Sequence, residues 1–320
     1  MATNIYLGYP PENIKQWIIA DAERKYQELL QTPLTFTAKE DSSVAFGCWN
    51  IEDVYDEETG EYTSTKEPYL PEYDEDRDVY YVSVTDWEEN IITTEFSLKL
   101  NYSIDNGKTW QKYNLNENIN LASGQSIMLK ATAENFINNR IVWIIGSGGD
   151  HPQVSFKLSG NIVASGNINS LLTPDFINPD SRNNILDYEF CYLFNNESSL
   201  VSASKMILPS KNIMRYGYAY MFGGCDNLVD APELPATNIG TESYGSMFME
   251  CTSLTKAPKV LPIKSLMDSE YFAMFLMCSS LKTAPKILAE EFLGNDKPGY
   301  EHLENPSYQA SAMGCMFTNT

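Results

Sequence analysis

The sequence predicts a multi-domain α+β protein with an N-terminal arm and helix over residues 1–33, an antiparallel β-sandwich over 34–172 and a repeat domain over 173–320. Three patterns predict this class: apolar residues at helical spacing near the start, short alternating runs between glycine turns in the middle, and a motif with a period of 26–28 residues in the last third. A chain of 320 residues is long enough for two or three domains with cores of their own.

Residues 1–30 predict an extended arm followed by one amphipathic helix. Apolar side chains recur three or four residues apart after Pro10-Pro11, and Pro33 ends the helix because proline has no amide hydrogen to continue it. The arm has no evident cover within the chain. Two interpretations follow: the arm and helix dock onto a larger assembly, or both pack on the next domain. The candidate anchoring residues are Ile5, Tyr6, Leu7, Tyr9, Ile14, Trp17 and Ile18.

Residues 34–172 predict an antiparallel, Ig-like β-sandwich. Asp-Asn-Gly, Ala-Ser-Gly and Gly-Ser-Gly-Gly turns separate short, partly alternating apolar runs, which is the pattern of antiparallel strands. The runs cover residues 34–38, 96–102, 126–130 and 154–158.

An acidic insert at residues 40–95 interrupts the sandwich and holds eighteen carboxylates against Lys66 and Arg77. Three of its aspartates alternate as the ligands of calcium loops do, although the glycine and the later glutamate of such loops are missing. These weak calcium candidates are Asp74, Asp76 and Asp78. The insert is therefore a solvated loop, a calcium site or a surface for a basic partner.

Residues 103–110 read Ser-x-Asp-x-Gly-x-Thr-Trp, which is the Asp-box of sialidases, where aspartate and glycine close a tight hairpin. The box is structural in that family. A sialidase also needs several boxes, a group of arginines and a tyrosine nucleophile, whereas this chain has one box and five arginines. The sequence therefore predicts that the protein is not an enzyme, and a glycan-active enzyme is a distant alternative.

The motif Phe-x-x-(Cys or Glu)-x-x-Leu occurs four times in the last third of the chain and predicts a leucine-rich-repeat solenoid. A second aromatic residue lies four positions before each phenylalanine, which predicts one helical turn with both rings on one face. The leucines are expected to point inward, and Ala-Pro after three of them ends the turn. The expected repeat core is Phe194, Leu200, Phe222, Cys225, Leu228, Phe248, Cys251, Leu254, Phe275, Cys278 and Leu281.

Three of these residues are cysteines at one phase of the repeat, which predicts a ladder of buried free thiols. A disulfide or metal interpretation is weaker, because paired Cys-x-x-Cys spacing is missing and His151 and His302 stand alone. The sequence therefore predicts no metal and no cofactor.

The repeats are irregular at both ends. Glu197 stands where the other repeats have cysteine, which suits a capping repeat, and residues 289–312 add chain that predicts a protruding loop. Met316-Phe317 restarts the phase, but neither the leucine nor a polar cap follows. Because an open end would expose the core, we expect the solenoid to be incomplete at Thr320, with further repeats beyond it.

The formal net charge of −21 argues against nucleic acid or an anionic membrane as a partner. The sequence has no run of eighteen apolar residues, which a transmembrane helix would need. Its first residues lack the basic and apolar regions of a signal peptide. We therefore expect no nucleic-acid partner, no membrane partner and no secretion.

Residues 221–228 (MFGGCDNL) and 247–258 (MFMECTSLTKAP) resemble the BspA-type leucine-rich repeats. Such repeats occur in surface and secreted proteins of Bacteroides-group gut bacteria and in virion proteins of their crAss-like or similar phages. The resemblance covers about residues 186–320. The runs between residues 35 and 168 resemble the β module that precedes such repeats, and residues 5–11 (IYLGYPP) resemble the opening of gut-phage virion proteins.

This resemblance implies a non-enzymatic structural or adhesive protein of a gut-bacteriophage virion, such as a head fibre, a capsid decoration or a tail-associated protein. It implies that the arm binds virion structural proteins, that the repeats bind a host-surface glycan or protein, and that the protein is a homo-oligomer on the virion surface. The alternative is a leucine-rich-repeat adhesin on a bacterial cell surface. A start without a signal peptide favours the virion.

Overall fold

Strands and turns make up most of the protein. The computed structural model describes residues 12–55, 62–86, 88–145, 151–178, 180–263, 265–266, 269–289, 291–292, 316–317 and 320. The helices are α1 (Glu12–Leu30), α2 (Arg140–Ile145) and the 3-10 helix η1 (Ile168–Leu171). The strands are β1 (Leu34–Ala38), β2 (Ser42–Tyr55), β3 (Tyr62–Pro68), β4 (Glu72–Asp74), β5 (Val79–Thr85), β6 (Ile91–Phe96), β7 (Leu100–Ser103), β8 (Gln111–Lys112), β9 (Asn118–Leu121), β10 (Ser126–Ala131), β11 (His151–Ser159), β12 (Ile162–Asn167), β13 (Asn184–Ile185), β14 (Leu200–Ile207), β15 (Asn212–Ile213), β16 (Asn238–Ile239), β17 (Val260–Leu261), β18 (Ser265–Leu266), β19 (Lys286–Ile287) and β20 (Glu291–Phe292).

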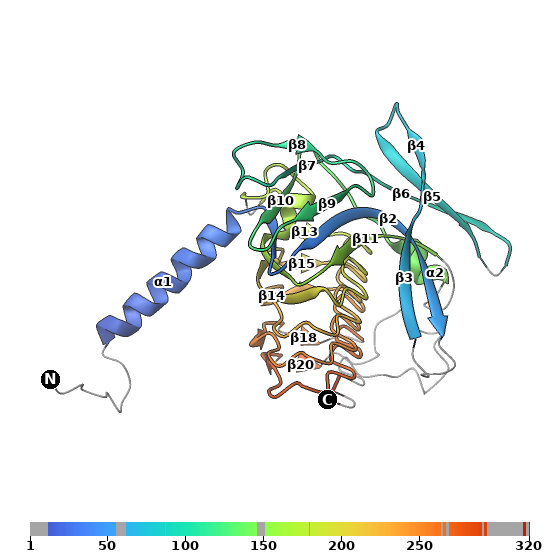
Figure 1. Ribbon diagram of the computed structural model, residues 1–320. Coiled ribbons are helices and arrows are strands. Elements are labelled where there is room, and N and C mark those ends of the chain that lie inside the picture. The colour runs from blue at the N-terminus through green and yellow to red at the C-terminus, as the bar shows by residue number, and fades with distance from the viewer. Residues whose placement is uncertain are drawn as a thin grey trace.

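The predicted N-terminal helix is present as α1 and stands out from the body of the molecule (Figure 1). Asp21 pairs with Lys25 one turn later, at 2.7 Å between Oδ2 and Nζ, which supports the exposed helix. The helix ends before Pro33, and Leu30 O accepts a hydrogen bond from Asn167 Nδ2 at 3.0 Å. The C-terminal end of α1 is therefore fastened to the body.

Two sheets face each other in the N-terminal half. The first has the strand order β14-β12-β1-β10-β7-β8, and the second is β11-β2-β3 with β9 paired to β2. Phe36 on β1 and Phe156 on β11 meet between the sheets with ring centroids 4.8 Å apart, and Phe46 on β2 lies at the same distance from Phe156. Alternate residues of β10 are buried, as expected for a strand with one face on a core. The strands predicted at 34–38, 126–130 and 154–158 lie in β1, β10 and β11.

The run predicted at residues 96–102 is not one strand. β6 ends at Phe96, and β7 begins at Leu100. Between them, Ser97 N donates to Phe136 O at 3.0 Å and Ser97 Oγ donates to Asn135 Oδ1 at 2.6 Å. The prediction of a continuous strand is wrong because Ser97 bonds to the loop after β10 instead of continuing a strand ladder.

Much of the acidic insert forms strands, not the solvated loop that was one interpretation of it. β2 and β3 pair as a long antiparallel hairpin, and β4, β5 and β6 form a three-stranded sheet of their own. Figure 1 shows both reaching beyond the sandwich. Tyr80 stacks on Phe96 with centroids 5.2 Å apart, so an aromatic pair helps to hold the three-stranded sheet together.

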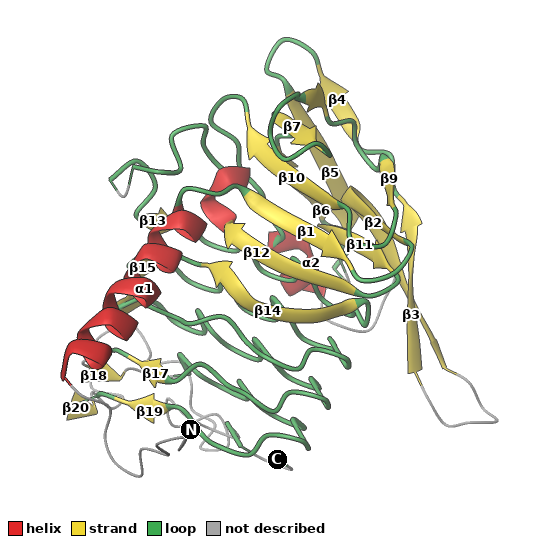
Figure 2. Ribbon diagram, turned by 60° about the vertical axis from the view of Figure 1, so that its left-hand side comes forward, coloured by secondary structure: helices red, strands yellow, loops and turns green. Residues whose placement is uncertain are grey.

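The repeats stack on one another, but they do not form the predicted solenoid. Their short parallel strands pair in three separate small sheets, β13-β15-β16, β17-β19 and β18-β20, and no closed solenoid forms among the described residues (Figure 2). Turns take the place of the expected helical turn. The predicted α+β class with a C-terminal leucine-rich-repeat solenoid is therefore wrong: the protein is mostly β, and helix in its described residues is confined to α1, α2 and η1. We call the described residues 184–292 the repeat stack.

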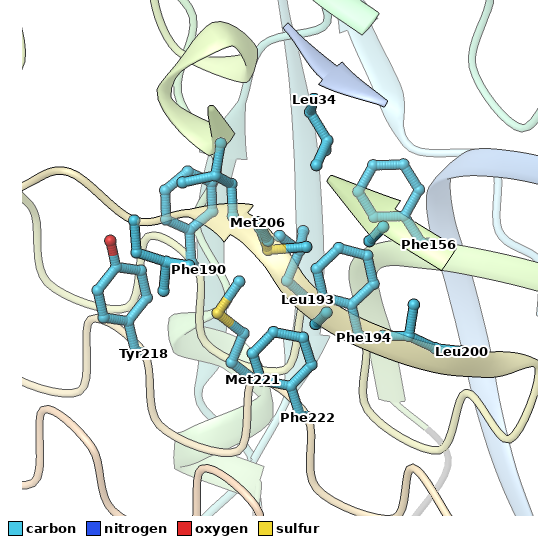
Figure 3. Close-up of a cluster of buried hydrophobic side chains, with 14 of the residues drawn as sticks. Leu34, Phe156, Phe190, Leu193, Phe194, Leu200, Met206, Tyr218, Met221 and Phe222 are labelled. Carbon is cyan, nitrogen blue, oxygen red and sulfur yellow. The ribbon is translucent and has the colours of Figure 1, made fainter. Parts of the chain in front are cut away.

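The sandwich and the repeat stack share one sheet and one core. β14 belongs to the first repeat and pairs in parallel with β12 of the sandwich, across the domain boundary expected at residue 172. Phe194 of the first repeat stacks on Phe156 with centroids 5.0 Å apart and planes 7° apart. Figure 3 shows these rings in one cluster with Leu34 and Phe222. The core of the sandwich therefore continues into the repeat stack.

Candidate binding surface

One side of the repeat stack consists of four turn segments, residues 188–196, 216–224, 242–250 and 269–277. The first, fifth and ninth residue of each segment has a left-handed backbone, with φ between 51° and 70°. These residues are Tyr188, Tyr192, Asn196, Tyr216, Tyr220, Gly224, Glu242, Ser246, Glu250, Ser269, Ala273 and Met277. The predicted helical turn is therefore wrong, since an α-helix has negative φ throughout. We call the outer side of the four segments the turn face.

Backbone hydrogen bonds fix each turn segment in two directions. Within the first segment, Leu193 N donates to Phe190 O at 3.3 Å. Between the first and second segments, Phe190 N donates to Gly217 O at 2.9 Å and Phe194 N donates to Met221 O at 2.8 Å. These bonds satisfy the backbone groups of the segments and offset the cost of their left-handed residues. Each repeat therefore holds the next through its backbone.

Two columns of aromatic rings run behind the turn face. Phe222 and Phe248 stack with centroids 5.3 Å apart, and Phe248 and Phe275 stack at 5.6 Å. The second column consists of Phe190, Tyr218, Tyr244 and Tyr271. Phe317 stacks on Phe275 with centroids 5.6 Å apart, so it extends the first column at the position that the repeat spacing predicts. Most of the loop expected at residues 289–312 lies outside the described residues.

The structure places the expected repeat core behind the turn face. Ten of its eleven residues are fully buried, namely Phe194, Leu200, Phe222, Cys225, Leu228, Phe248, Cys251, Leu254, Phe275 and Cys278. Leu281 is half-buried and packs against the same cluster. The periodic pattern therefore identified the interior even though it predicted the wrong backbone around it.

The three thiols of the cysteine phase are buried and not crosslinked. Each donates to the carbonyl of a phenylalanine in the preceding repeat: Cys251 Sγ lies 3.1 Å from Phe222 O, and Cys278 Sγ lies 3.0 Å from Phe248 O. Burial raises the pKa of Cys278 to about 12 and the pKa of Cys251 well above its ordinary value. The cysteine position of these repeats therefore suits a small side chain with one weak hydrogen-bond donor. Its thiols are structural.

Glu197 occupies the cysteine phase of the first repeat, where the repeat stack meets the sandwich. Its Oε1 lies 2.5 Å from Nζ of Lys66, a buried lysine on β3. Its Oε2 accepts a hydrogen bond from Leu158 N at 2.8 Å, and Lys66 Nζ also donates to Phe156 O at 2.7 Å. Burial raises the pKa of Glu197, and the nearby lysine opposes that rise. The irregular first repeat is thus fitted to the sandwich by a buried ion pair.

The outer side of the first two turn segments carries two pairs of stacked tyrosines, of which Tyr188, Tyr192 and Tyr216 are buried. Tyr188 and Tyr216 stack at 5.1 Å, and Tyr192 and Tyr220 stack at 4.8 Å. Val142 of α2 packs against this group. The repeat motif did not predict these rings, although the sequence holds a signal for them: tyrosine recurs at both positions with the same spacing of 28 residues as the first two core phenylalanines.

A pocket of about 130 Å³ lies where the turn face meets the sandwich. Ile51 on β2, Val142 on α2 and His151 and Gln153 on β11 line one side, and the first three turn segments line the other. The described residues hold no group of three or more histidine, cysteine, aspartate or glutamate residues placed to hold a metal ion. His302 lies outside the described residues.

Glu189 is a second buried carboxylate of the repeat stack. It pairs with Arg182, and its Oε2 accepts a hydrogen bond from Leu186 N at 3.0 Å. Its side chain is fully buried. Burial raises the pKa of Glu189 to about 7, more than Arg182 and the hydrogen bond from Leu186 lower it.

We expect Glu189 to make the protein more stable at acidic pH than at alkaline pH. The folded pKa lies above the unfolded value, so this contribution is complete below pH 4.5 and is lost as the pH rises through about 7. A rise in pKa from 4.5 to about 7 corresponds to about 3 kcal/mol. Urea denaturation at pH 5 and pH 8 measures it: Glu189→Gln should remove this part of the pH dependence, and the exposed control Glu233→Gln should keep it. Equal pH dependence in both variants would contradict the assignment.

The Asp-box closes the turn between β7 and β8. Asp105 Oδ1 accepts hydrogen bonds from Thr109 N at 2.9 Å and from Ser103 Oγ at 2.7 Å, and Trp110 Nε1 donates to Gly107 O at 3.1 Å. Gly107 has a φ of 81°, a left-handed conformation that favours glycine. The hydrogen bonds from Thr109 and Ser103 hold the pKa of Asp105 well below its ordinary value. The carboxylate of the box is therefore occupied by its own turn.

The calcium candidates take part in the turn between β4 and β5. Asp74 Oδ1 accepts hydrogen bonds from Asp76 N at 3.0 Å and from Arg77 N at 3.1 Å. Asp78 Oδ1 accepts one from Tyr73 OH at 2.8 Å. Within the described part of the chain, these aspartates do not form a metal-holding group.

Among the anchoring candidates, Ile18 is the one whose side chain the structure describes. It is 50% exposed, and its neighbour Ile19 is 67% exposed. Ile5, Tyr6, Leu7 and Tyr9 lie outside the described residues, and Ile14 and Trp17 lie in α1 with side chains that are not described. The described part of α1 therefore leaves two isoleucines uncovered.

The sequence matches no protein-family model, and no curated protein or solved structure matches it. Among the described residues, no helix combines the length and the apolar composition needed to span a bilayer. The resemblance noted from the sequence, and the function that it implies, therefore stay predictions.

Proposed function

We propose that this chain is a non-enzymatic adhesive protein, attached to a virion through its N-terminal segment and displaying the turn face to a host surface. The observation that carries the proposal is the way the turn segments are joined. Phe190, Tyr192, Phe194 and Asn196 each donate a backbone hydrogen bond to the next segment. A face built in this way holds its side chains in fixed columns, which lowers the entropy lost on binding.

The helix α1 supports the attachment part of the proposal. It leaves the body at its C-terminal end, and Ile18 and Ile19 stay exposed on the part that projects. Two adjacent exposed isoleucines on a projecting helix offer another protein an apolar surface to cover. The attachment site is therefore separate from the turn face, and both can be occupied together.

Binding to cells tests the adhesive part. Fluorescently labelled chain is incubated with a panel of Bacteroides-group gut bacteria, and bound label is measured by flow cytometry. We expect saturable binding to at least one strain, retained after deletion of residues 1–20. Arg215→Glu, an exposed change next to the second turn segment, combined with Met277→Arg, an exposed change on the fourth, should abolish it, whereas the control Glu75→Arg in the β4–β5 turn should not. Absence of binding to every strain, or equal binding by the turn-face variant, would contradict the proposal.

A further inference from the structure

A glycine pair in the wall of the pocket lets two asparagine amides of the first turn segment lie against the second segment. Gly223 and Gly224 stand where the first segment has Asn195 and Asn196 and the third has Met249 and Glu250. A Cβ on Gly224 would lie 2.1 Å from Asn196 Oδ1, and Gly224 has a left-handed φ of 70°. Only glycine at this position lets the amide of Asn196 lie across the second segment. The amides of Asn195 and Asn196 take the space that side chains at Gly223 and Gly224 would need, and all four residues line the pocket.

Two amide side chains in the pocket wall are held in fixed orientations. Gln153 is buried, and its Nε2 donates to Tyr192 O at 2.9 Å. Asn195 Nδ2 donates to Gly223 O at 2.8 Å. Because hydrogen bonds to the protein already orient both amides, a ligand does not have to order them. The wall is therefore prepared for hydrogen bonding with a polar ligand.

The charge of the lining selects against an acidic ligand. No lysine or arginine is among the residues that line the pocket, whereas Glu250 is. Burial raises the pKa of Glu250, and the nearby Asp226 raises it further, so the surroundings already disfavour one negative charge. A second carboxylate, brought by the ligand, would meet like charge without a lysine or arginine to balance it.

Tyr192 and Tyr220 add aromatic surface to these polar groups. A ligand that matches the whole lining carries hydroxyl groups, which both donate to and accept from amides and carboxylates, together with an apolar C–H surface for the rings. We propose that this pocket binds one neutral sugar unit. Its volume of about 130 Å³ lies below the range of pockets that enclose drug-sized molecules, so it fits a single unit at the end of a glycan. The proposal rests on the adhesive function and specifies its ligand.

Saturation-transfer NMR on the full chain tests the site. The probes are the methyl glycosides of glucose, galactose, mannose, fucose and N-acetylglucosamine, with sialic acid as the acidic comparison. We expect transfer to at least one neutral probe and none to sialic acid. Met249→Trp fills the pocket from its rim and should weaken binding about tenfold or more. The control Val229→Trp changes an exposed residue of the repeat stack that lies outside the turn segments and outside the pocket lining, and it should bind as the natural chain does.

Three outcomes would overturn the proposal: no transfer to any neutral probe, stronger transfer to sialic acid, or unchanged binding by Met249→Trp. The cell assay separates this failure from failure of the proposed function. If Met249→Trp binds cells normally while the Arg215→Glu and Met277→Arg double variant does not, the turn face is adhesive but this pocket is not its sugar site. If neither the natural chain nor any variant binds cells, the proposed adhesive function is wrong, whatever the NMR result.

Discussion

Replacing Glu197 with glutamine should lower the free energy of unfolding by about 3–5 kcal/mol, the cost of leaving a buried charge without its partner. The change keeps the size of the side chain and an oxygen for Leu158 N, but it removes the negative charge that faces Lys66 at 2.5 Å. Lys66 would keep one carbonyl acceptor, Phe156 O. Guanidinium denaturation at neutral pH measures the loss.

Two further variants make the test specific. Glu67→Gln changes an exposed carboxylate next to Lys66 on β3 and should alter stability by no more than about 0.5 kcal/mol. Lys66→Met combined with Glu197→Cys replaces the ion pair with apolar side chains and gives the first repeat the cysteine of the others, so it should recover most of the loss. A loss below about 1 kcal/mol in Glu197→Gln, the range of an exposed pair, would contradict a buried pair at this joint.

Phe248→Ala should lower the free energy of unfolding by a similar amount, about 3–5 kcal/mol. The ring of Phe248 is fully buried and lies between Phe222 at 5.3 Å and Phe275 at 5.6 Å, so its removal leaves a cavity and breaks the column in the middle. The neighbouring rings cannot close the gap, because the backbone bonds between segments fix their spacing. Thermal and urea denaturation both report the change.

Phe317→Ala is the matched control for the column. Among the described residues its ring stacks on one phenylalanine, Phe275, and it is 37% exposed, so truncation should cost less than half as much as at Phe248. Phe248→Leu should fall between the two. Equal losses at Phe248 and Phe317 would show that the column does not depend on its interior rings.

The repeat period was enough to locate the interior but not its backbone. An aromatic residue at every fourth position, such as Phe190 and Phe194, is compatible with one turn of α-helix and also with consecutive turns that have a left-handed residue between them. The sequence does not distinguish these, because the left-handed positions carry residues such as Tyr192 and Glu242, which have no preference for positive φ. Hydrogen bonds to the next repeat decide the conformation, and a single repeat does not reveal them.

The joint between the two halves could be predicted only in part. Glu197 was recognisable as a departure from the cysteine phase, but its partner Lys66 lies 131 residues earlier in the chain, within the acidic insert. The pairing of β14 with β12 was not predictable either, because β14 belongs by its period to the repeats and joins the sandwich by its position in space. The pocket follows from the same joint, since residues from both halves line it.

Hydrogen exchange of the backbone amides tests most directly whether the turn face is the rigid surface on which the proposed function depends. The amides of Phe190, Phe194 and Phe222 donate to the next repeat, and within the sandwich the amide of Ala38 on β1 donates to Gln125 O. If the backbone bonds join the repeats and the sandwich into one cooperative unit, these amides should exchange together, at the slow rate set by global unfolding. Faster exchange of the turn-segment amides than of the Ala38 amide would contradict the account, because the turn face would then open independently of the sandwich.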